Sequence, residues 1–269
     1  MRKILAFSRH YLAERGLAVR PQTHRTTGQY SGFSMTWGGE QEGVVRGAAV
    51  LVSHERGEAI FFVENERDFI QRMHLHGRFY ELDELEMIAA HANDGTYLDI
   101  GANVGNHAVF AGLFLPFKRI LAVEPNPRPR RLLELNLRLN GLFAQSTILP
   151  VGFSDQEGEA SIVVPLVNNI GAAHISDDAS SGVRVNIVKG DDALGEEPLG
   201  FVKMDIEGHE LRALRGMRGV LERDKPTLLL EVHRKNDISV GDLMAQLGYR
   251  LEHRLDFAEK ISNQLFVAA

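Results

Sequence analysis

Several residue types and patterns are absent from this chain of 269 residues. It has no cysteine, which excludes disulfide bonds, thiolate metal sites and cysteine nucleophiles. No run approaches the roughly 18 apolar residues that a membrane-spanning helix needs, and no apolar signal-peptide core follows the charged N-terminus. The net charge of -6 leaves no basic surplus of the kind that nucleic-acid binding requires. We therefore expect a cytoplasmic protein that binds neither a membrane nor nucleic acid.

Hydrophobic residues make up 44% of the chain, enough for a sizeable core. The first 35 residues are locally basic, with a short helical pattern over residues 7–17 and loop signals at Pro21 and Gly28. We interpret this part as a solvated arm. Residues 34–63 alternate β-like runs with turn residues. We expect residues 1–64 to form an arm and a small β extension, and residues 65–269 to form the main domain.

The stretch YLDIGANVGNH, residues 97–107, predicts a strand, a tight turn and the start of a helix. Gly101 and Gly105 permit unusual φ angles and a close approach of the backbone to a ligand. The helix start offers free N–H groups and a positive dipole end to an anion. A second apolar strand, residues 120–123, ends in Glu124, where an acid typically binds ribose hydroxyls. Together these features predict a site for an adenosine-containing cofactor.

The glycine spacing distinguishes between two cofactors. The dinucleotide fingerprint G-x-G-x-x-G has a middle glycine that makes room for a pyrophosphate, and here Asn103 stands in its place. The pattern Asp-x-Gly-x-x-x-Gly instead resembles motif I of class I S-adenosylmethionine methyltransferases, whose ligand carries an amino acid carboxylate. The sequence favours S-adenosylmethionine over NAD, and an ordinary βα turn with incidental glycines stays an alternative.

Strands and helices alternate along the rest of the chain, which indicates parallel βαβ units covered by helices on both faces. Asn65 is the expected cap of the first helix, with Phe69 on its buried face, and Leu82 begins the buried face of the second. Helices are predicted over residues 65–76, 82–92, 128–140, 210–223 and 239–247, and strands over residues 96–100, 146–151, 160–165, 183–188, 201–205, 227–232, 249–253 and 264–267. A polar loop is expected over residues 168–182.

Several stretches together resemble the FkbM-type S-adenosylmethionine-dependent methyltransferases. They cover roughly residues 75–235 and include FYE at 79–81, LDIGANVGN at 98–106, VEPNP at 123–127, Asn136 with Asn140, SD at 154–155, KMDIEGHE at 203–210 and residues 226–233. The resemblance implies a Rossmann-like α/β fold with the seven-strand class I sheet in the order 3-2-1-4-5-7-6. It also implies O-methylation of a hydroxyl on a sugar or natural-product-like small molecule, without identifying that acceptor.

In open α/β sheets, ligands bind beyond the carboxyl ends of the strands. We expect Glu124 to bind the ribose diol, and Asn126 either to assist it or only to shape its turn. Ser154 and Asp155, after Phe153, are placed where adenine would bind, although Phe153 is equally suited to the core. The residues expected around the methionine moiety are Asp99, Gly101, Asn103, Gly105 and Asn106, with Asp205 as a further cofactor ligand.

Methyl transfer requires alignment of the nucleophile, the methyl group and the sulfur, and removal of the hydroxyl proton. Asp205 and His233, which end the fourth and fifth strands, are the candidate bases, with Glu231 on the same strand face as His233. A divalent metal held by these three residues is an alternative that the sequence does not favour. We interpret Glu210 as a helix-dipole partner and His209 as a helix-surface residue. Acceptor contacts are expected from Tyr80, Glu81, Asn169, His174 and Glu207.

Three other functions stay open at this point. A nicotinamide-dependent oxidoreductase is disfavoured by the missing glycine. A nucleic-acid methyltransferase would carry an Asn/Asp-Pro-Pro-aromatic run after the fourth strand, where this chain has DIEG at 205–208. A catalytically silent S-adenosylmethionine-binding protein is the third. The expected partner is a small molecule with a hydroxyl group, and a homo-oligomer is compatible with the sequence.

Overall fold

A seven-stranded sheet forms the centre of the computed structural model, which describes residues 14, 17–21, 33–37, 45–163, 174–176, 182–258 and 260–269. The strand order is β7-β6-β5-β12-β13-β15-β14, and only β15 runs antiparallel to its neighbours. Numbered along the chain, this is 3-2-1-4-5-7-6, which confirms the predicted class I sheet. The strands are β5 (Thr96–Ile100), β6 (Arg119–Val123), β7 (Ser146–Leu149), β12 (Leu199–Met204), β13 (Thr227–His233), β14 (Tyr249–Ala258) and β15 (Ile261–Ala268).

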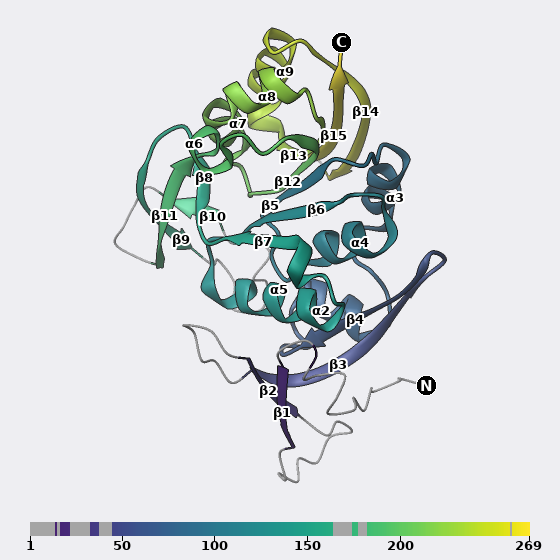
Figure 1. Ribbon diagram of the computed structural model, residues 1–269. Coiled ribbons are helices and arrows are strands. Elements are labelled where there is room, and N and C mark those ends of the chain that lie inside the picture. Colours follow the sequence, from purple (N-terminus) through teal and green to yellow (C-terminus); the bar gives the residue numbers. More distant parts are fainter. Residues whose placement is uncertain are drawn as a thin grey trace.

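Helices cover the sheet on both faces (Figure 1). One face carries α3 (Leu82–Ala90), α4 (Asn106–Phe114) and α5 (Pro127–Leu139), and the other carries α7 (Glu210–Gly216), α8 (Arg218–Asp224) and α9 (Asp237–Gln246). Side chains alternate along each strand. Tyr97 and Phe201 therefore pack with Phe110 of α4, whereas Leu98 packs with Leu214 of α7. The same alternation decides which polar residues of a strand meet on one face.

The strands that precede the main domain pack against it. A four-stranded sheet has the order β1-β2-β3-β4, with β1 (Leu17–Pro21), β2 (Phe33–Trp37), β3 (Val45–His54) and β4 (Gly57–Val63). Phe61 of β4 belongs to the same hydrophobic cluster as Phe110. The side chains of Asn136 and Asn140, on α5 and at its end, accept hydrogen bonds from the backbone N–H groups of Phe62 and Ile60. These amides satisfy the free edge of β4. The division at residue 64 stays a prediction.

A second small sheet has the order β10-β9-β11-β8 and corrects one sequence expectation. Residues 152–154 do not end the third strand of the main sheet, because β7 stops at Leu149 and Pro150 has no N–H to extend the ladder. They form β8 and pair in parallel with β11. The strands are β8 (Gly152–Ser154), β9 (Gly158–Val163), β10 (His174–Ser176) and β11 (Val183–Lys189), and α6 (Gly190–Leu194) follows.

Three expectations about the helices were wrong. The first helix is α2 (Phe69–Leu75), and its cap is Asp68, whose side chain accepts a hydrogen bond from Gln71 N. The side chain of Asn65, the expected cap, accepts from Arg67 N instead. Phe69 and Leu82, placed on buried faces by spacing, are each 45% exposed. The helix predicted over residues 210–223 is two helices, α7 and α8, separated at Met217. Short 3₁₀ turns lie at Phe143–Gln145 and Arg234–Asn236.

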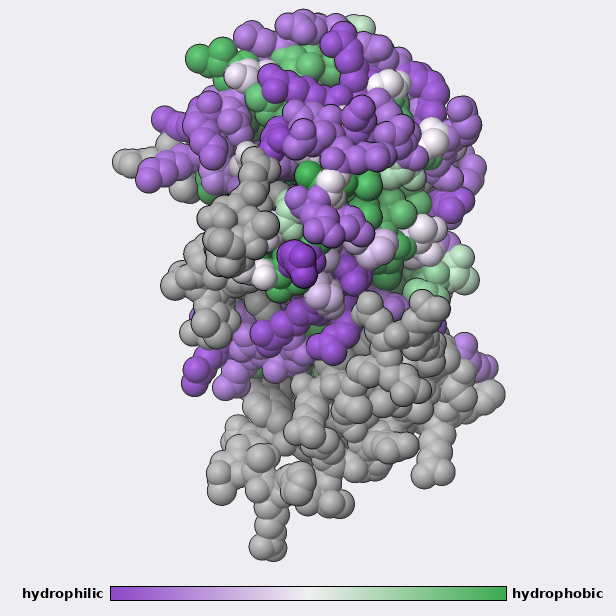
Figure 2. All heavy atoms as spheres, turned by 90° about the vertical axis from the view of Figure 1, so that its left-hand side faces the viewer, coloured by the Kyte–Doolittle hydropathy of each residue, from purple (hydrophilic) through white to green (hydrophobic). Residues whose placement is uncertain are grey.

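On the face shown in Figure 2 the described surface is mostly hydrophilic, and hydrophobic residues gather near its middle. None of the helices in the described ranges is long and apolar enough to cross a membrane. Two predicted segments, the helix over residues 7–17 and the loop over residues 168–182, lie largely outside the described residues.

Candidate active site

The turn between β5 and α4 has the glycine-dependent geometry that its sequence predicts. Gly101 and Gly105 have φ angles of 82° and 88°, in the left-handed region. A Cβ atom on Gly101 would overlap the main-chain oxygen of Asp205 at the end of β12. Asn103 also has a positive φ, 49°, and its N–H is directed at Glu124. The turn therefore brings backbone close to the ends of β6 and β12.

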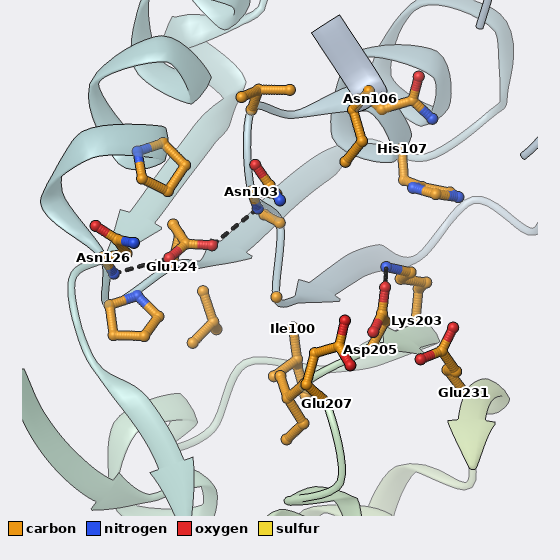
Figure 3. A pocket seen from close by; sticks show the side chains of 18 of the residues that line it. Ile100, Asn103, Asn106, His107, Glu124, Asn126, Lys203, Asp205, Glu207 and Glu231 are labelled. Atoms are coloured by element: carbon orange, nitrogen blue, oxygen red, sulfur yellow. Dashed lines mark hydrogen bonds and ion pairs between the residues drawn. The ribbon is translucent and has the colours of Figure 1, made fainter. Parts of the chain in front are cut away.

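Glu124 is the best-anchored acid of the cleft (Figure 3). Its two carboxylate oxygens accept hydrogen bonds from the backbone N–H groups of Asn103, at 2.9 Å, and Asn126, at 2.7 Å. Burial raises the pKa of Glu124 to about 7, against the lowering effect of these N–H groups and of Arg130. Each oxygen has a further lone pair, so the carboxylate can accept two hydroxyl donors from a ligand in the cleft.

Asn126 caps α5, since its side chain accepts from Arg128 N. It also lines the cleft beside Glu124. The shaping of the turn is thus visible in the structure, and direct assistance to a ligand stays a prediction.

A second group of acids lies across the cleft, where β12 and β13 end. Asp205, Glu207 and Glu231 line the cleft together with Lys203 (Figure 3). Lys203 is 4% exposed, and its ammonium nitrogen lies 3.5 Å from Asp205 Oδ2. Burial alone lowers the pKa of Lys203, but the carboxylates of Asp205, Asp99, Glu81 and Glu84 outweigh it and raise that pKa. Lys203 therefore stays cationic at the centre of an acidic group.

Two of these acids have pKa values that are far from ordinary. Burial, followed by the charges of Asp205 and Glu207, raises the pKa of Glu231 to about 10. Burial and the charges of Asp205 and Glu210 raise the pKa of Glu207 to about 7. The raised pKa favours the protonated form of Glu231, in which it can donate a hydrogen bond. Acids this close repel one another unless a cation or a proton intervenes, so the cleft favours a cationic ligand.

Tyr80 and Glu81 close one side of the cleft, as the sequence predicts. Asn106, at the start of α4, holds this segment: its side chain accepts from Tyr80 N and donates to Tyr80 O, both at 3.0 Å. Asn106 Oδ1 also lies 2.9 Å from His74 Nε2. Asn106 lines the cleft, but its side chain already makes hydrogen bonds that hold the Tyr80 backbone in place.

A family model described as the methyltransferase FkbM domain matches residues 99–251, more than half of the chain. The chain belongs to the FkbM methyltransferase family. The match begins at the carboxyl end of β5 and includes β6, β12 and β13, whose carboxyl ends carry the residues described above.

Individual relatives of this FkbM chain resemble it over part of their length. It is 30% identical over 160 residues to the hexuronic acid methyltransferase AglP of Haloferax volcanii, covering 57% of this chain and 62% of AglP. It is 25% identical over 211 residues to the AMB antimetabolite synthetase AmbE of Pseudomonas aeruginosa, covering 61% of this chain and 10% of AmbE. A crystal structure of methyltransferase FkbM from Methylobacillus flagellatus is 21% identical, with a TM-score of 0.47, over 72% of this chain and 52% of the other. The chain thus spans less than two thirds of these relatives.

Several residues that sequence reasoning placed in the FkbM site lie elsewhere. Asp99 is fully buried and does not line the cleft, because its side chain points to the α4 face of the sheet beside Lys203. Ser154 and Asp155 are also outside the lining: Ser154 contacts His209, and Asp155 pairs with Arg212. Gly152 and Phe153 of the same strand do line the cleft, and because successive side chains of a strand face opposite sides, Ser154 faces His209 instead.

The end of β13 and the segment after β12 also differ from the expectation. His233 does not line the cleft, and its Nε2 lies 3.7 Å from Glu207 Oε2. His209 is not a surface residue: it is 8% exposed, with Nε2 3.0 Å from Ser154 Oγ. Glu210 accepts from Gly208 N at 2.8 Å and lies outside the lining, in keeping with a local role at the start of α7.

Asn169 and the side chain of His174 lie outside the described residues, whereas Ile162, which precedes their loop, lines the cleft.

Three polar residues near the cleft were missed by sequence reasoning. A signal existed for Lys203, since a lysine inside an apolar strand is almost never fully buried unless it is paired. His107 lines the cleft, and Glu84 lies behind it at 4% exposure. Neither stands out in the sequence, because both fall within ordinary helical patterns.

The raised pKa of Glu124 leads to a pH prediction. Below about pH 7 the carboxyl protonates in the empty cleft and loses acceptor capacity, so affinity for S-adenosylhomocysteine should rise roughly tenfold from pH 6 to pH 8. Calorimetric titration at both pH values measures this. Glu124→Gln should bind weakly at both. Glu210→Gln is the matched control, because burial also raises the pKa of Glu210 to about 7 although it does not line the cleft. A Glu124→Gln variant that binds like the wild type at pH 8 would contradict the role of Glu124.

Proposed function

We propose that this chain transfers a methyl group from S-adenosylmethionine to a hydroxyl group of a small, sugar-like acceptor. The observation that carries this proposal is the Glu124 carboxylate, fixed by two N–H groups at the tip of β6 and next to the glycine turn after β5. An acid at this position suits a ribose diol. Asn103 occupies the place of the glycine that a dinucleotide needs, which favours S-adenosylmethionine over NAD.

The cleft also suits the charge of the donor. When bound, S-adenosylmethionine supplies an activated methyl group on a positively charged sulfur. Asp205, Glu207 and Glu231 stand on the side of the cleft opposite Glu124, with Lys203 as their nearest cation (Figure 3). Repulsion among these carboxyl groups is unfavourable when no ligand is bound, and a cationic ligand would reduce it. The absence of a Cβ at Gly101 lets the turn after β5 come close to the main chain of Asp205.

Roles for the acids follow from their positions. Asp205, held by Lys203 at the end of β12, is the proposed base that accepts the proton of the acceptor hydroxyl. Glu231, in its protonated form, donates a hydrogen bond to another oxygen of the acceptor. His233 lies outside the lining and acts, at most, through Glu207. The sugar-like acceptor is supported by the relative AglP, whose name describes methylation of a hexuronic acid.

The test is transfer of label from S-adenosylmethionine, labelled on its methyl group, to a set of free sugars, hexuronic acids and hydroxylated metabolites. A labelled product that survives mild alkali is an ether and supports methylation of a hydroxyl. A product that alkali cleaves is a carboxyl ester and contradicts it. Binding of S-adenosylhomocysteine without transfer to any compound of the set would favour the catalytically silent alternative.

A further inference from the structure

A cluster of three metal-ligating side chains lies at the wall of the cleft, between the start of α3 and α4. His107 Nε2 is 3.6 Å from Glu81 Oε2 and 3.7 Å from Glu84 Oε2. One ligand atom from each residue fits within 4.8 Å of the other two. His107 and Glu81 line the cleft, and Glu84 lies behind them. None of these residues is needed for the methyl transfer proposed above.

The imidazole of His107 is the second observation. The residue is 5% exposed, and its Nε2 atom has no hydrogen-bond partner among the described residues. A buried polar atom without a partner is costly. Glu84 Oε1 accepts a hydrogen bond from Asn263 Nδ2, which leaves Oε2 directed at His107. The unpartnered nitrogen thus points into a space bounded by two carboxylate oxygens.

The two separations from His107 Nε2 are close to those between ligands of one ion. Distances of 3.6 and 3.7 Å are too long for hydrogen bonds. Two ligands at about 2.0–2.2 Å from a tetrahedral ion lie roughly 3.3–3.6 Å apart, whereas acceptors around an ammonium group would stand farther apart. We propose that Glu81, Glu84 and His107 bind a divalent first-row transition-metal ion. One imidazole with two carboxylates is a ligand set that suits zinc or manganese better than magnesium, which prefers oxygen alone.

The surrounding charge permits such an ion. Lys203 is the cation that faces the cluster, and its ion pair is with Asp205. Four carboxyl groups, those of Glu81, Glu84, Asp99 and Asp205, act on Lys203. A divalent ion would still leave the group without excess positive charge. It would fix Glu81, which has a φ of 55° at the cap of α3, against α4 and so hold this wall of the cleft.

A second cluster, formed by Glu207, Glu231 and His233, provides the matched comparison. His233 Nε2 also has no hydrogen-bond partner among the described residues, but the His233 side chain is 24% exposed, against 6% for His107, so this second cluster lies nearer to solvent. Variants of both clusters therefore separate the proposed site from general acidity of the cleft.

The experiment uses the full chain, stripped with a chelator, dialysed and titrated with Co²⁺ as a spectroscopic probe and with Zn²⁺ by metal analysis. We expect one equivalent of metal per chain. His107→Ala and Glu84→Gln, each checked for native circular dichroism, should lower the affinity by about 10- to 100-fold. The Glu207→Gln, His233→Ala double variant should bind like the wild type.

Each result decides the proposal. Less than stoichiometric binding by the wild type overturns it, and so does loss of binding in the double variant of the second cluster. Full retention of binding in His107→Ala also overturns it. If His107→Ala does not fold, Glu84→Gln together with the double variant still decides. Metal binding is measured without methyl transfer. A negative result would therefore contradict the metal site and leave the proposed function unaffected.

Discussion

An Asp205→Asn variant is expected to turn over about 10²–10⁴-fold more slowly than the wild type, the usual contribution of general base catalysis. The amide keeps the shape of the carboxylate and removes its basicity. Affinity for S-adenosylhomocysteine should change little, because the anchored carboxylate of Glu124 lies on the opposite side of the cleft (Figure 3). Single-turnover rates and calorimetric titration measure the two quantities separately.

His233→Ala is the comparison for this result. Its imidazole does not line the cleft, so we expect a smaller loss of turnover than in Asp205→Asn. Burial and the nearby Lys235 lower the pKa of His233 below its ordinary value. A direct base role would therefore show as a change in the pH–rate profile on the acid side. Full activity in the Asp205→Asn, His233→Ala double variant would contradict base catalysis by either residue and leave alignment alone as the mechanism.

A Gly101→Ala variant is expected to be destabilised by about 2 kcal/mol or more and to lose cofactor affinity. The left-handed conformation at a φ of 82° alone costs an alanine roughly 1–2 kcal/mol. The new Cβ would also overlap the main-chain oxygen of Asp205 and push the ends of β5 and β12 apart. The urea midpoint of unfolding and calorimetric affinity together measure both effects.

Gly241→Ala is the control for this substitution. Gly241 lies within α9, and a Cβ there would have no atom within 4 Å. An alanine should stabilise the helix by up to about 1 kcal/mol. Equal urea midpoints for Gly101→Ala and Gly241→Ala would contradict the claim that the close approach of Gly101 to the main chain of Asp205 requires a glycine.

The main sheet was predictable because its signals are local. An apolar run with turn residues at both ends identifies β5, and Glu124 follows β6 directly. The resemblance to the FkbM-type methyltransferases then implied the strand order. Alternation along a strand, however, decides which side a residue faces, and a motif does not show it. Asp99 was therefore placed in the cleft although it faces α4.

The errors in the site depend on contacts between distant parts of the chain. Ser154 contacts His209 and does not line the cleft, although its neighbour Phe153 on β8 does. His209 became buried because it contacts Ser154 across 55 residues. Lys203 of β12 and His107 of α4 line the same cleft only because the fold brings these two elements together. Sequence periodicity indicates which face of one helix or strand is buried, but it does not show which distant residues that element contacts.

The most direct test of the central claim is a pair of calorimetric titrations of the full chain, one with S-adenosylhomocysteine and one with NAD. The account predicts binding of S-adenosylhomocysteine, no detectable binding of NAD, and an affinity loss in Glu124→Ala that corresponds to about 1–3 kcal/mol for an unmet hydrogen-bonding requirement. Binding of NAD without binding of S-adenosylhomocysteine would contradict it.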